Sequence, residues 1–374
     1  MRKLLLTAIM AVGVTSSAVF GQNAGVVWTA VKNSPFGGSK VNAIAWGKDK
    51  FVAVGDKGKI AYSPNGVNWT AVTKNPFGAA TAVSAIAWGN GKFVAGGRYD
   101  NDMNKACHDG GSSFYRESGK IAYSLDGITW TEVKNDSILK NSGVSGIVWK
   151  NDRFTAGTWG SECPCADSEC DFFSNSAHSP DGITWTVDKE RSSGDEGSSF
   201  RGGIEGNGVF IRIENSDEGM GSWAQYSSDG KDWEPVENYP FGGGYTLASA
   251  WGGDKFVVIG SVYDDEGKPK NMIAYSSDGT GWTLADKYPF KNAANFYTMV
   301  WVNNRFIATG GISEYDHKES KTKYRNGEMA YSLDGITWTA VKNYPFGNSV
   351  TTVIVWENGV FVAGSSDGKL AYSK

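Results

Sequence analysis

Four short apolar or alternating segments follow one another between residues 41 and 72. They read VNAIAWG, KFVAVGD, GKIAYSP and GVNWTAV, and Gly, Asn or Asp stands at most of their ends. Segments of this length that are rich in β-branched and aromatic residues and bounded by turn residues are typical of β-strands. The pattern predicts a small antiparallel sheet of four strands joined by short turns.

The same unit recurs along the whole chain. The first segment returns as VSAIAWG at 83–89, VSGIVWK at 144–150, RGGIEGN at 201–207, LASAWGG at 247–253, YTMVWVN at 297–303 and TTVIVWE at 351–357. The junction of the third and fourth segments, AYSLDGITWT, occurs letter for letter at 122–131 and at 330–339. Self-similarity with a period of about 40 to 50 residues is the signature of a propeller whose blades are four-stranded sheets.

The two ends of the repeat complement each other. A fourth segment, VVWTAV, stands alone at 26–31, and the chain ends on a third segment, GKLAYSK. We therefore predict an all-β fold, a seven-bladed β-propeller of four-stranded blades, in which strand 26–31 completes the last blade. Closure of this kind removes free sheet edges. Residues 22–374 are expected to form this one domain.

The Asp-Gly pair of the repeated stretch predicts a tight turn between the third and fourth strands. Gly accepts a positive φ without steric cost, and the Asp carboxylate accepts hydrogen bonds from backbone N–H groups nearby. We assign this structural role to Asp126, Asp181, Asp229, Asp278 and Asp334.

The Ser-x-Asp-Gly-x-x-Trp stretch resembles the Asp-box of BNR-type propellers, which include sialidases, sortilin-like receptor domains and photosystem II assembly factors. The repeat, with the motifs IAYSxDGxTWTxV, PFG and AIAWGxGKFVAGG in this order, resembles still more closely the repeat of uncharacterised exported propellers of spirochaetes and related bacteria. The resemblance covers essentially the whole chain after residue 21, and it implies the fold but not an activity. This chain lacks the spacer between Asp and Gly that the usual Asp-box has.

The first 21 residues have the pattern of a secretory signal peptide, with Arg2 and Lys3 before an apolar stretch and small residues before Gly21. No later stretch is apolar enough for a transmembrane helix. We therefore expect an exported monomer in the periplasm, at the cell surface or secreted. The formal net charge of −4 makes nucleic acid a poor partner.

The blades differ mainly in the connection between their second and third strands. Long inserts occur at 98–119, 158–176, 214–222, 261–271 and 311–328. These inserts are expected to share one end of the blades with the connections between blades, opposite the Asp-Gly turns. Because one end is uniform and the other varied, we place function at the varied end.

The binding candidates are insert side chains that do not recur with the repeat. They are Tyr99, Asp100, Asp102, His108, Phe114, Tyr115, Trp159, Phe172, Phe173, Tyr263 and Tyr315. The recurring Pro-Phe-Gly aromatics are expected to pack inside. Asp100, Asp102 and Asn104 offer oxygen ligands, so Ca²⁺ is one hypothesis, although no loop has EF-hand spacing. The alternative is that these loops are simply solvated, and no other cofactor is expected.

All four cysteines lie in the inserts of blades two and three. In an exported protein, clustered cysteines in even number favour disulfides. We expect Cys107 to pair with one of Cys163 and Cys165, and Cys170 with the other. The alternative is a thiolate metal centre that includes His108, but the spacing lacks the paired Cys-x-x-Cys of structural zinc.

No nucleophile, zinc or phosphate-loop motif occurs in the sequence. The nearest match to the arginine stretch of sialidases is FIRIEN at 210–215, which contains Arg212 but no proline. The main hypothesis is a noncatalytic scaffold that binds a protein or a cell-envelope glycan at the varied end. The alternative is a sialidase-like glycoside hydrolase with its site on the same face.

Overall fold

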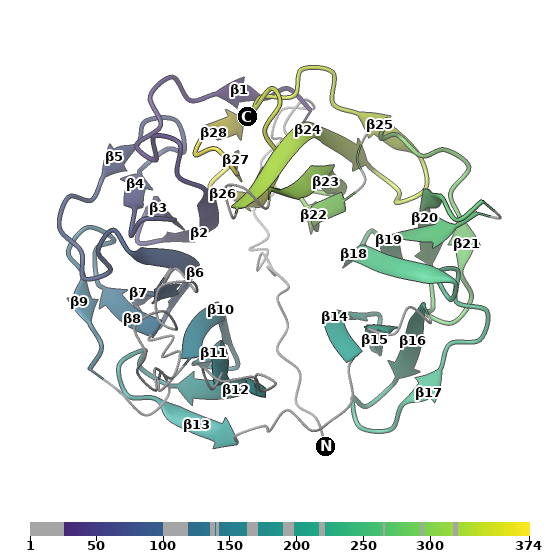
Figure 1. Ribbon diagram of the computed structural model, residues 1–374, viewed down its shortest axis with the longest axis horizontal. Coiled ribbons are helices and arrows are strands. Elements are labelled where there is room, and N and C mark those ends of the chain that lie inside the picture. The colour runs from purple at the N-terminus through teal and green to yellow at the C-terminus, as the bar shows by residue number, and fades with distance from the viewer. Residues whose placement is uncertain are drawn as a thin grey trace. The chain divides into compact units, whose positions relative to one another are not determined.

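The computed structural model consists of β-strands joined by turns (Figure 1). It describes residues 26–99, 119–134, 139, 142–162, 171–189, 198–216, 221–264, 266–291, 293, 295–316 and 321–374. In this part of the chain, 28 strands form seven antiparallel sheets of four strands each. The described residues contain no helix long and apolar enough to cross a membrane. We call the sheets blades one to seven, in chain order.

The chain divides into two compact units, the first of which holds Val31–Glu196 and Gly364–Leu370. Three blades belong to it, and their first strands β2, β6 and β10 are neighbours in that order. Blade one is β2 (Val41–Gly47), β3 (Lys50–Gly55), β4 (Ile60–Ser63) and β5 (Thr70–Ala71). Blade two is β6 (Thr81–Gly89), β7 (Lys92–Tyr99), β8 (Gly119–Ser124) and β9 (Thr131–Glu132). Blade three is β10 (Ser142–Lys150), β11 (Arg153–Glu162), β12 (Asp171–Ser179) and β13 (Thr186–Lys189).

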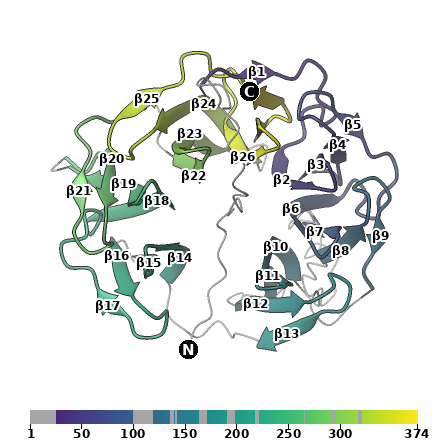
Figure 2. The same cartoon turned by 180° about the vertical axis from the view of Figure 1, so that it is seen from behind.

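The second unit holds Gly197–Ala363, Ala371–Lys374 and the N-terminal residues through Ala30. Its first strands β14, β18, β22 and β26 are again neighbours in chain order, as Figure 2 shows from behind. Blade four is β14 (Ser198–Gly206), β15 (Val209–Ser216), β16 (Ser222–Ser227) and β17 (Glu234–Pro235). Blade five is β18 (Gly244–Gly252), β19 (Lys255–Tyr263), β20 (Pro269–Ser276) and β21 (Thr283–Leu284). Blade six is β22 (Asn295–Val302), β23 (Arg305–Asp316), β24 (Lys321–Ser332) and β25 (Trp338–Ala340).

Blade seven joins the two ends of the chain. It consists of β26 (Thr351–Glu357), β27 (Val360–Ser365), β28 (Leu370–Ser373) and β1 (Thr29–Ala30). Thr29 lies opposite Tyr372, and Ala30 lies opposite Ala371. The N-terminal strand therefore completes the last sheet as predicted, with a two-residue ladder inside the expected range 26–31. The seven sheets confirm the predicted seven-bladed β-propeller.

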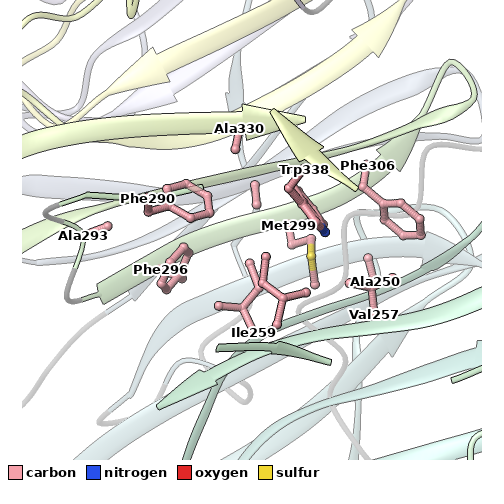
Figure 3. Close-up of a cluster of buried hydrophobic side chains, with 12 residues drawn as sticks. Ala250, Val257, Ile259, Phe290, Ala293, Phe296, Met299, Phe306, Ala330 and Trp338 are labelled. Carbon is pink, nitrogen blue, oxygen red and sulfur yellow. The ribbon is translucent and has the colours of Figure 1, made fainter. Parts of the chain in front are cut away.

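The core lies between the faces of successive blades. Blade five presents Val257 and Ile259 from β19 to Met299 of β22, Phe306 of β23 and Trp338 of blade six (Figure 3). All five side chains are buried. The second strand of a blade has a sheet neighbour on each side and packing on both faces, which explains why segments such as KFVVIG are apolar without alternation.

Trp28 takes the same place in blade seven that Trp338 takes in blade six. It is 5% exposed and packs with Ile307 and Met329 of blade six. Its ring centroid lies 5.9 Å from that of Phe361 on β27. The N-terminal strand therefore contributes an aromatic side chain to the core as well as two residues of ladder.

The first strands of blades one to six each contain a bulge close to their start. Register shifts lie between Val41 and Ala43, Val83 and Ala85, Val144 and Gly146, Phe200 and Gly202, Thr246 and Ala248, and Phe296 and Thr298. A bulge leaves one residue outside the ladder and re-aims its side chain. In blade one the bulged Asn42 donates to Val83 O of blade two at 3.0 Å.

Replacement of Trp28 by Ala is expected to lower the free energy of unfolding by about 3 to 5 kcal/mol, because a large buried ring is removed and leaves a cavity. Denaturant titration measures the change. Val27→Ala is the matched control, because the adjacent Val27 side chain is 56% exposed. Equal losses in the two variants would contradict the role assigned to Trp28.

Candidate functional site

The Asp-Gly turns occupy one end of every sheet from blade two to blade six. In blade two, Asp126 Oδ1 accepts hydrogen bonds from Ile128 N at 2.8 Å and Thr129 N at 2.7 Å. Ser124 Oγ donates to the same oxygen at 3.0 Å and accepts from Gly127 N at 2.8 Å. Asp181, Asp229, Asp278 and Asp334 repeat this arrangement, and Asn65 takes the same place in blade one.

The turns of blades two and three also fit against the preceding blade. Lys50 Nζ in the first hairpin of blade one donates to Asp126 O at 2.9 Å, and Lys92 Nζ of blade two donates to Asp181 O at 2.8 Å. Gly127 has φ +74°, and a Cβ there would lie 2.7 Å from Val52 Cγ2. The turn carboxylates are thus occupied by backbone donors that hold the blade in place.

The Asp126 carboxyl has a lowered pKa. Burial raises its pKa, but hydrogen bonds from Thr129 N, Ile128 N and Ser124 outweigh this effect and bring the pKa to about 2. The backbone donors Gly281 and Thr280 lower the pKa of Asp278 to about 2 in the same way. Both carboxylates are therefore charged throughout the neutral and mildly acidic range.

The Pro-Phe connections at the opposite, varied end, four of which read Pro-Phe-Gly and one Pro-Phe-Lys, are part of the core. Their phenylalanines, Phe36, Phe77, Phe241, Phe290 and Phe346, are all buried. Two of the tyrosines that precede these phenylalanines form hydrogen bonds, since Tyr239 Oη bonds Thr246 Oγ1 at 2.8 Å and Tyr344 Oη donates to Ser349 O at 2.9 Å. These recurring aromatics therefore pack inside, as expected from their recurrence, and do not form a binding surface.

Most predicted candidates of blades two and three lie outside the described residues, or their side chains do. Outside the described residues lie Asp100, Asp102, Asn104, Cys107, His108, Phe114, Tyr115, Cys163, Cys165 and Cys170. Tyr99, Trp159, Phe172 and Phe173 fall within β7, β11 and β12, but their side chains are not described. The calcium and disulfide hypotheses therefore stay predictions. Among the residues with described positions, no group of three or more His, Cys, Asp or Glu is placed to hold a metal ion.

Blade five presents a pair of tyrosines at its varied end. The Tyr245 ring on β18 meets the Tyr263 ring on β19 edge to face, with centroids 6.2 Å apart and an interplanar angle of 83°. Tyr263 is 52% exposed. The following turn is fixed by Asp264, whose Oδ1 accepts from Glu266 N at 3.0 Å and Lys268 N at 2.8 Å. The exposed ring therefore directly precedes a turn that Asp264 closes by hydrogen bonds.

Blade six carries a second pair and a longer ribbon. The Tyr297 and Tyr324 rings meet with centroids 5.8 Å apart at 74°. Strands β23 and β24 continue beyond the sheet, with Ser313 opposite Tyr324 and Tyr315 opposite Thr322. Because side chains alternate along a strand and opposed residues share a face, Tyr315 and Tyr324 lie on the same face of the ribbon. Tyr315 is 56% exposed.

The other face of the ribbon is charged. Alternation places Glu314, Asp316, Lys323 and Arg325 there. Lys323 Nζ lies 2.5 Å from Asp316 Oδ2, and Arg325 pairs with Glu314. These cross-strand pairs stiffen the ribbon that presents Tyr315.

We call Tyr245, Tyr263, Tyr297, Tyr315 and Tyr324 the tyrosine surface. It lies at the varied ends of blades five and six, whose first strands β18 and β22 are neighbours. Tyr263 and Tyr315 were candidates from the sequence, whereas Tyr245 and Tyr297 were missed because they belong to recurring first strands. The sequence did hold one signal for Tyr297. It occupies the bulge position of its first strand, and the equivalent residue is Asn or Ser in blades one to three.

Arg212, the nearest match to a sialidase arginine, is engaged within blade four. Its Nε donates to Gln225 Oε1 at 3.1 Å and lies 3.3 Å from Glu214 Oε1. The guanidinium also lies over the Trp233 ring, 4.6 Å from its centroid. A guanidinium with these partners has a structural role in the blade.

No protein-family model matches this chain, and no curated protein sequence matches it. Among solved structures, it is similar to YCF48 bound to D1 peptide, with a TM-score of 0.59, 14% identity, and coverage of 92% of this chain and 94% of that one. Trypanosoma rangeli sialidase in complex with sialic acid gives a TM-score of 0.45 at 13% identity, covering 88% of this chain and 59% of the sialidase. YjhT gives 0.45 at 11% identity, with coverage of 83% and 98%. The likeness to YCF48 supports the propeller fold and, at this identity, nothing further.

Replacement of Asp126 by Ala is expected to lower the free energy of unfolding by about 1 kcal/mol at pH 7, because the turn N–H groups lose their acceptor. Asp126→Asn should keep most of the stability, since Asn65 makes the same bonds in blade one. The carboxylate contributes fully above its unfolded pKa of about 4, and its contribution declines as pH falls toward 2. Denaturation of the wild type and the Asn variant between pH 7 and pH 2 should therefore show a stability difference that shrinks at acid pH. A difference independent of pH would contradict this assignment.

Proposed function

We propose that this protein is an exported, noncatalytic binding scaffold that recognises a protein segment through the tyrosine surface. The observation that carries the proposal is the gathering of five tyrosines at the varied ends of two neighbouring blades, two of them more than half exposed. A monomer's surface rarely concentrates large aromatic side chains without a binding role.

Tyrosine suits protein recognition for a physical reason. It offers a large apolar ring and a hydroxyl, and it loses little conformational entropy on binding because it has only two side-chain torsions. Tyr is also enriched among interface residues whose truncation weakens binding most. The paired charges on the opposite face of the ribbon add groups of both signs beside the aromatic surface, as at the polar rim of a protein interface.

Hydrogen-bonded elements of the scaffold carry the two exposed tyrosines. Tyr263 precedes a turn closed by Asp264, and Tyr315 stands on a two-stranded ribbon with a continuous ladder. Preorganised side chains bind at lower entropic cost than side chains on loose loops. A similar use of the fold is known from YCF48, which was solved with a peptide bound.

The hydrolase alternative receives less support from the described residues. The arginine nearest to a sialidase motif, Arg212, is committed to Gln225, Glu214 and Trp233. A cell-envelope glycan stays the second class of partner, because sugars also stack on exposed aromatic rings. We retain the proposed disulfides in the inserts of blades two and three, which peptide mapping under non-reducing conditions would test.

Photocrosslinking in cells tests the proposed surface. A benzophenone amino acid at position 315 should form an adduct with a partner protein, whereas the same group at position 333 should not. Leu333 is a matched control, because it is 62% exposed on the same blade but belongs to the turn at the opposite end. The adduct should fall at least fivefold when Tyr263 and Tyr324 are replaced by Ala, and it should persist in Leu333→Ala.

Equal adducts from both positions would contradict the proposed surface. Absence of any protein adduct at position 315, combined with saturable binding of the purified protein to envelope glycans, would replace the protein partner by a glycan. Turnover of a glycoside substrate would contradict the noncatalytic role itself.

A further inference from the structure

Blade one carries a cavity of about 560 Å³ at its varied end. It lies between the hairpin that joins β3 to β4, the short outer strand β5, and the connection that leads on to blade two. Three lysines, Lys57, Lys59 and Lys74, are among the described residues that line it, and none of these described residues carries a carboxylate. In a protein with a formal net charge of −4, this is a local concentration of positive charge.

The walls of the cavity are fixed by hydrogen bonds between the hairpin and the connection. Gly58 N donates to Thr81 O at 2.6 Å, and Asn75 Nδ2 donates to Gly58 O at 3.1 Å. Gly58 has φ +64°, and a Cβ at this position would lie 2.1 Å from Gly78 O. The hairpin and the connection therefore meet at a glycine, and the hollow beside them is already formed.

The repeat provides an internal comparison for these charges. A lysine directly before the Ile-Ala-Tyr or Leu-Ala-Tyr sequence of the third strand occurs in blades one, two and seven, as Lys59, Lys120 and Lys369. In blade two Lys120 Nζ lies 3.4 Å from Glu132 Oε1, and in blade seven Lys369 Nζ lies 2.6 Å from Asp367 Oδ2. Lys120 and Lys369 thus each have an acidic neighbour.

Blade one has no acidic residue at either of the two equivalent positions. The residue that pairs with Ala61 in its sheet is Ala71, where the equivalent partner of Ala122 in blade two is Glu132. The residue two positions before Lys59 is Lys57, where blade seven has Asp367 before Lys369. Ala71 therefore places a small neutral side chain beside the cavity where blade two has a carboxylate. Lys57 places a second ammonium group where blade seven has a carboxylate.

The ammonium groups retain donors for a ligand. Lys59 Nζ donates to Phe36 O at 2.5 Å, a bond that positions the ammonium and uses one of its three N–H groups. Lys57 and Lys74 are exposed side chains. The volume falls within the range of small-ligand sites, about 300 to 1,000 Å³.

We propose that this cavity, which we call the lysine cavity, is a binding site for a multiply charged anionic group, a carboxylate or phosphate cluster. The three lysines supply the charge, whereas Lys120 of blade two and Lys369 of blade seven each lie beside a carboxylate. The cavity shares no residue with the tyrosine surface, so its function does not depend on the function proposed for that surface.

Isothermal titration calorimetry on the full chain with inorganic phosphate, citrate and a hexaglutamate peptide tests the proposal. We expect saturable binding of one equivalent of at least one probe, weakened by added salt. The double variant Lys57→Asp, Ala71→Glu installs the acids of blades seven and two, and it should weaken binding at least tenfold. Ala340→Glu makes the same substitution at the equivalent strand position of blade six and should leave affinity within twofold of the wild type.

The order of affinities identifies the source of the anion. Tighter binding of hexaglutamate than of citrate or phosphate would indicate an acidic peptide, and the reverse would indicate a small-molecule anion. Lys57→Gln with Lys74→Gln changes only exposed side chains and provides the same test if the acidic variant does not fold. The proposal would be overturned if no probe binds saturably, if the lysine variants bind as the wild type does, or if Ala340→Glu loses affinity to the same extent.

Discussion

The hydrogen bonds that close the Ser-x-Asp-Gly turn are the constraint on which the rest of the structure depends. A tight turn between the third and fourth strands leaves several backbone N–H groups without a ladder partner, and a turn side chain supplies the acceptor. The turn carbonyl then accepts from a lysine of the preceding blade, and the turn glycine admits close packing against that blade's second strand. One local motif therefore sets both the shape of a blade and its distance from the next.

Because one end of each blade is fixed in this way, the other end is free to vary. The connections between second and third strands range from a four-residue turn in blade one to a ribbon of twelve-residue strands in blade six. The chain uses this freedom in two chemically different ways. Blades five and six gather tyrosines, whereas blade one gathers lysines around a hollow.

The fold was predictable because it depends on periodicity, and the sites were only partly predictable because they depend on exceptions to it. Strand-length apolar segments and the lone fourth segment at 26–31 predicted seven sheets and the closure through Thr29 and Ala30. Tyr263 and Tyr315 were found because they stand in inserts. Tyr297 was missed because a bulge, which no propensity marks, re-aims a residue of a recurring strand. The lysine cavity was missed because its charge arises from the loss of acids at Ala71 and Lys57, which is visible only when blades are compared position by position in register.

The pairing of β1 with β28 also has a consequence for the order in which the chain can fold. Thr29 is among the first described residues and Tyr372 is third from the end of the chain, so this contact spans nearly the full sequence. On the ribosome, the N-terminal strand emerges long before its partner exists, and the Trp28 ring has no pocket until blades six and seven have been made. Earlier blades can form from local contacts, whereas the last sheet needs β28 (Leu370–Ser373) as the partner of β1. The last sheet therefore closes only after Ala371 and Tyr372 have been made, and until then the chain has an open sheet edge and an uncovered tryptophan.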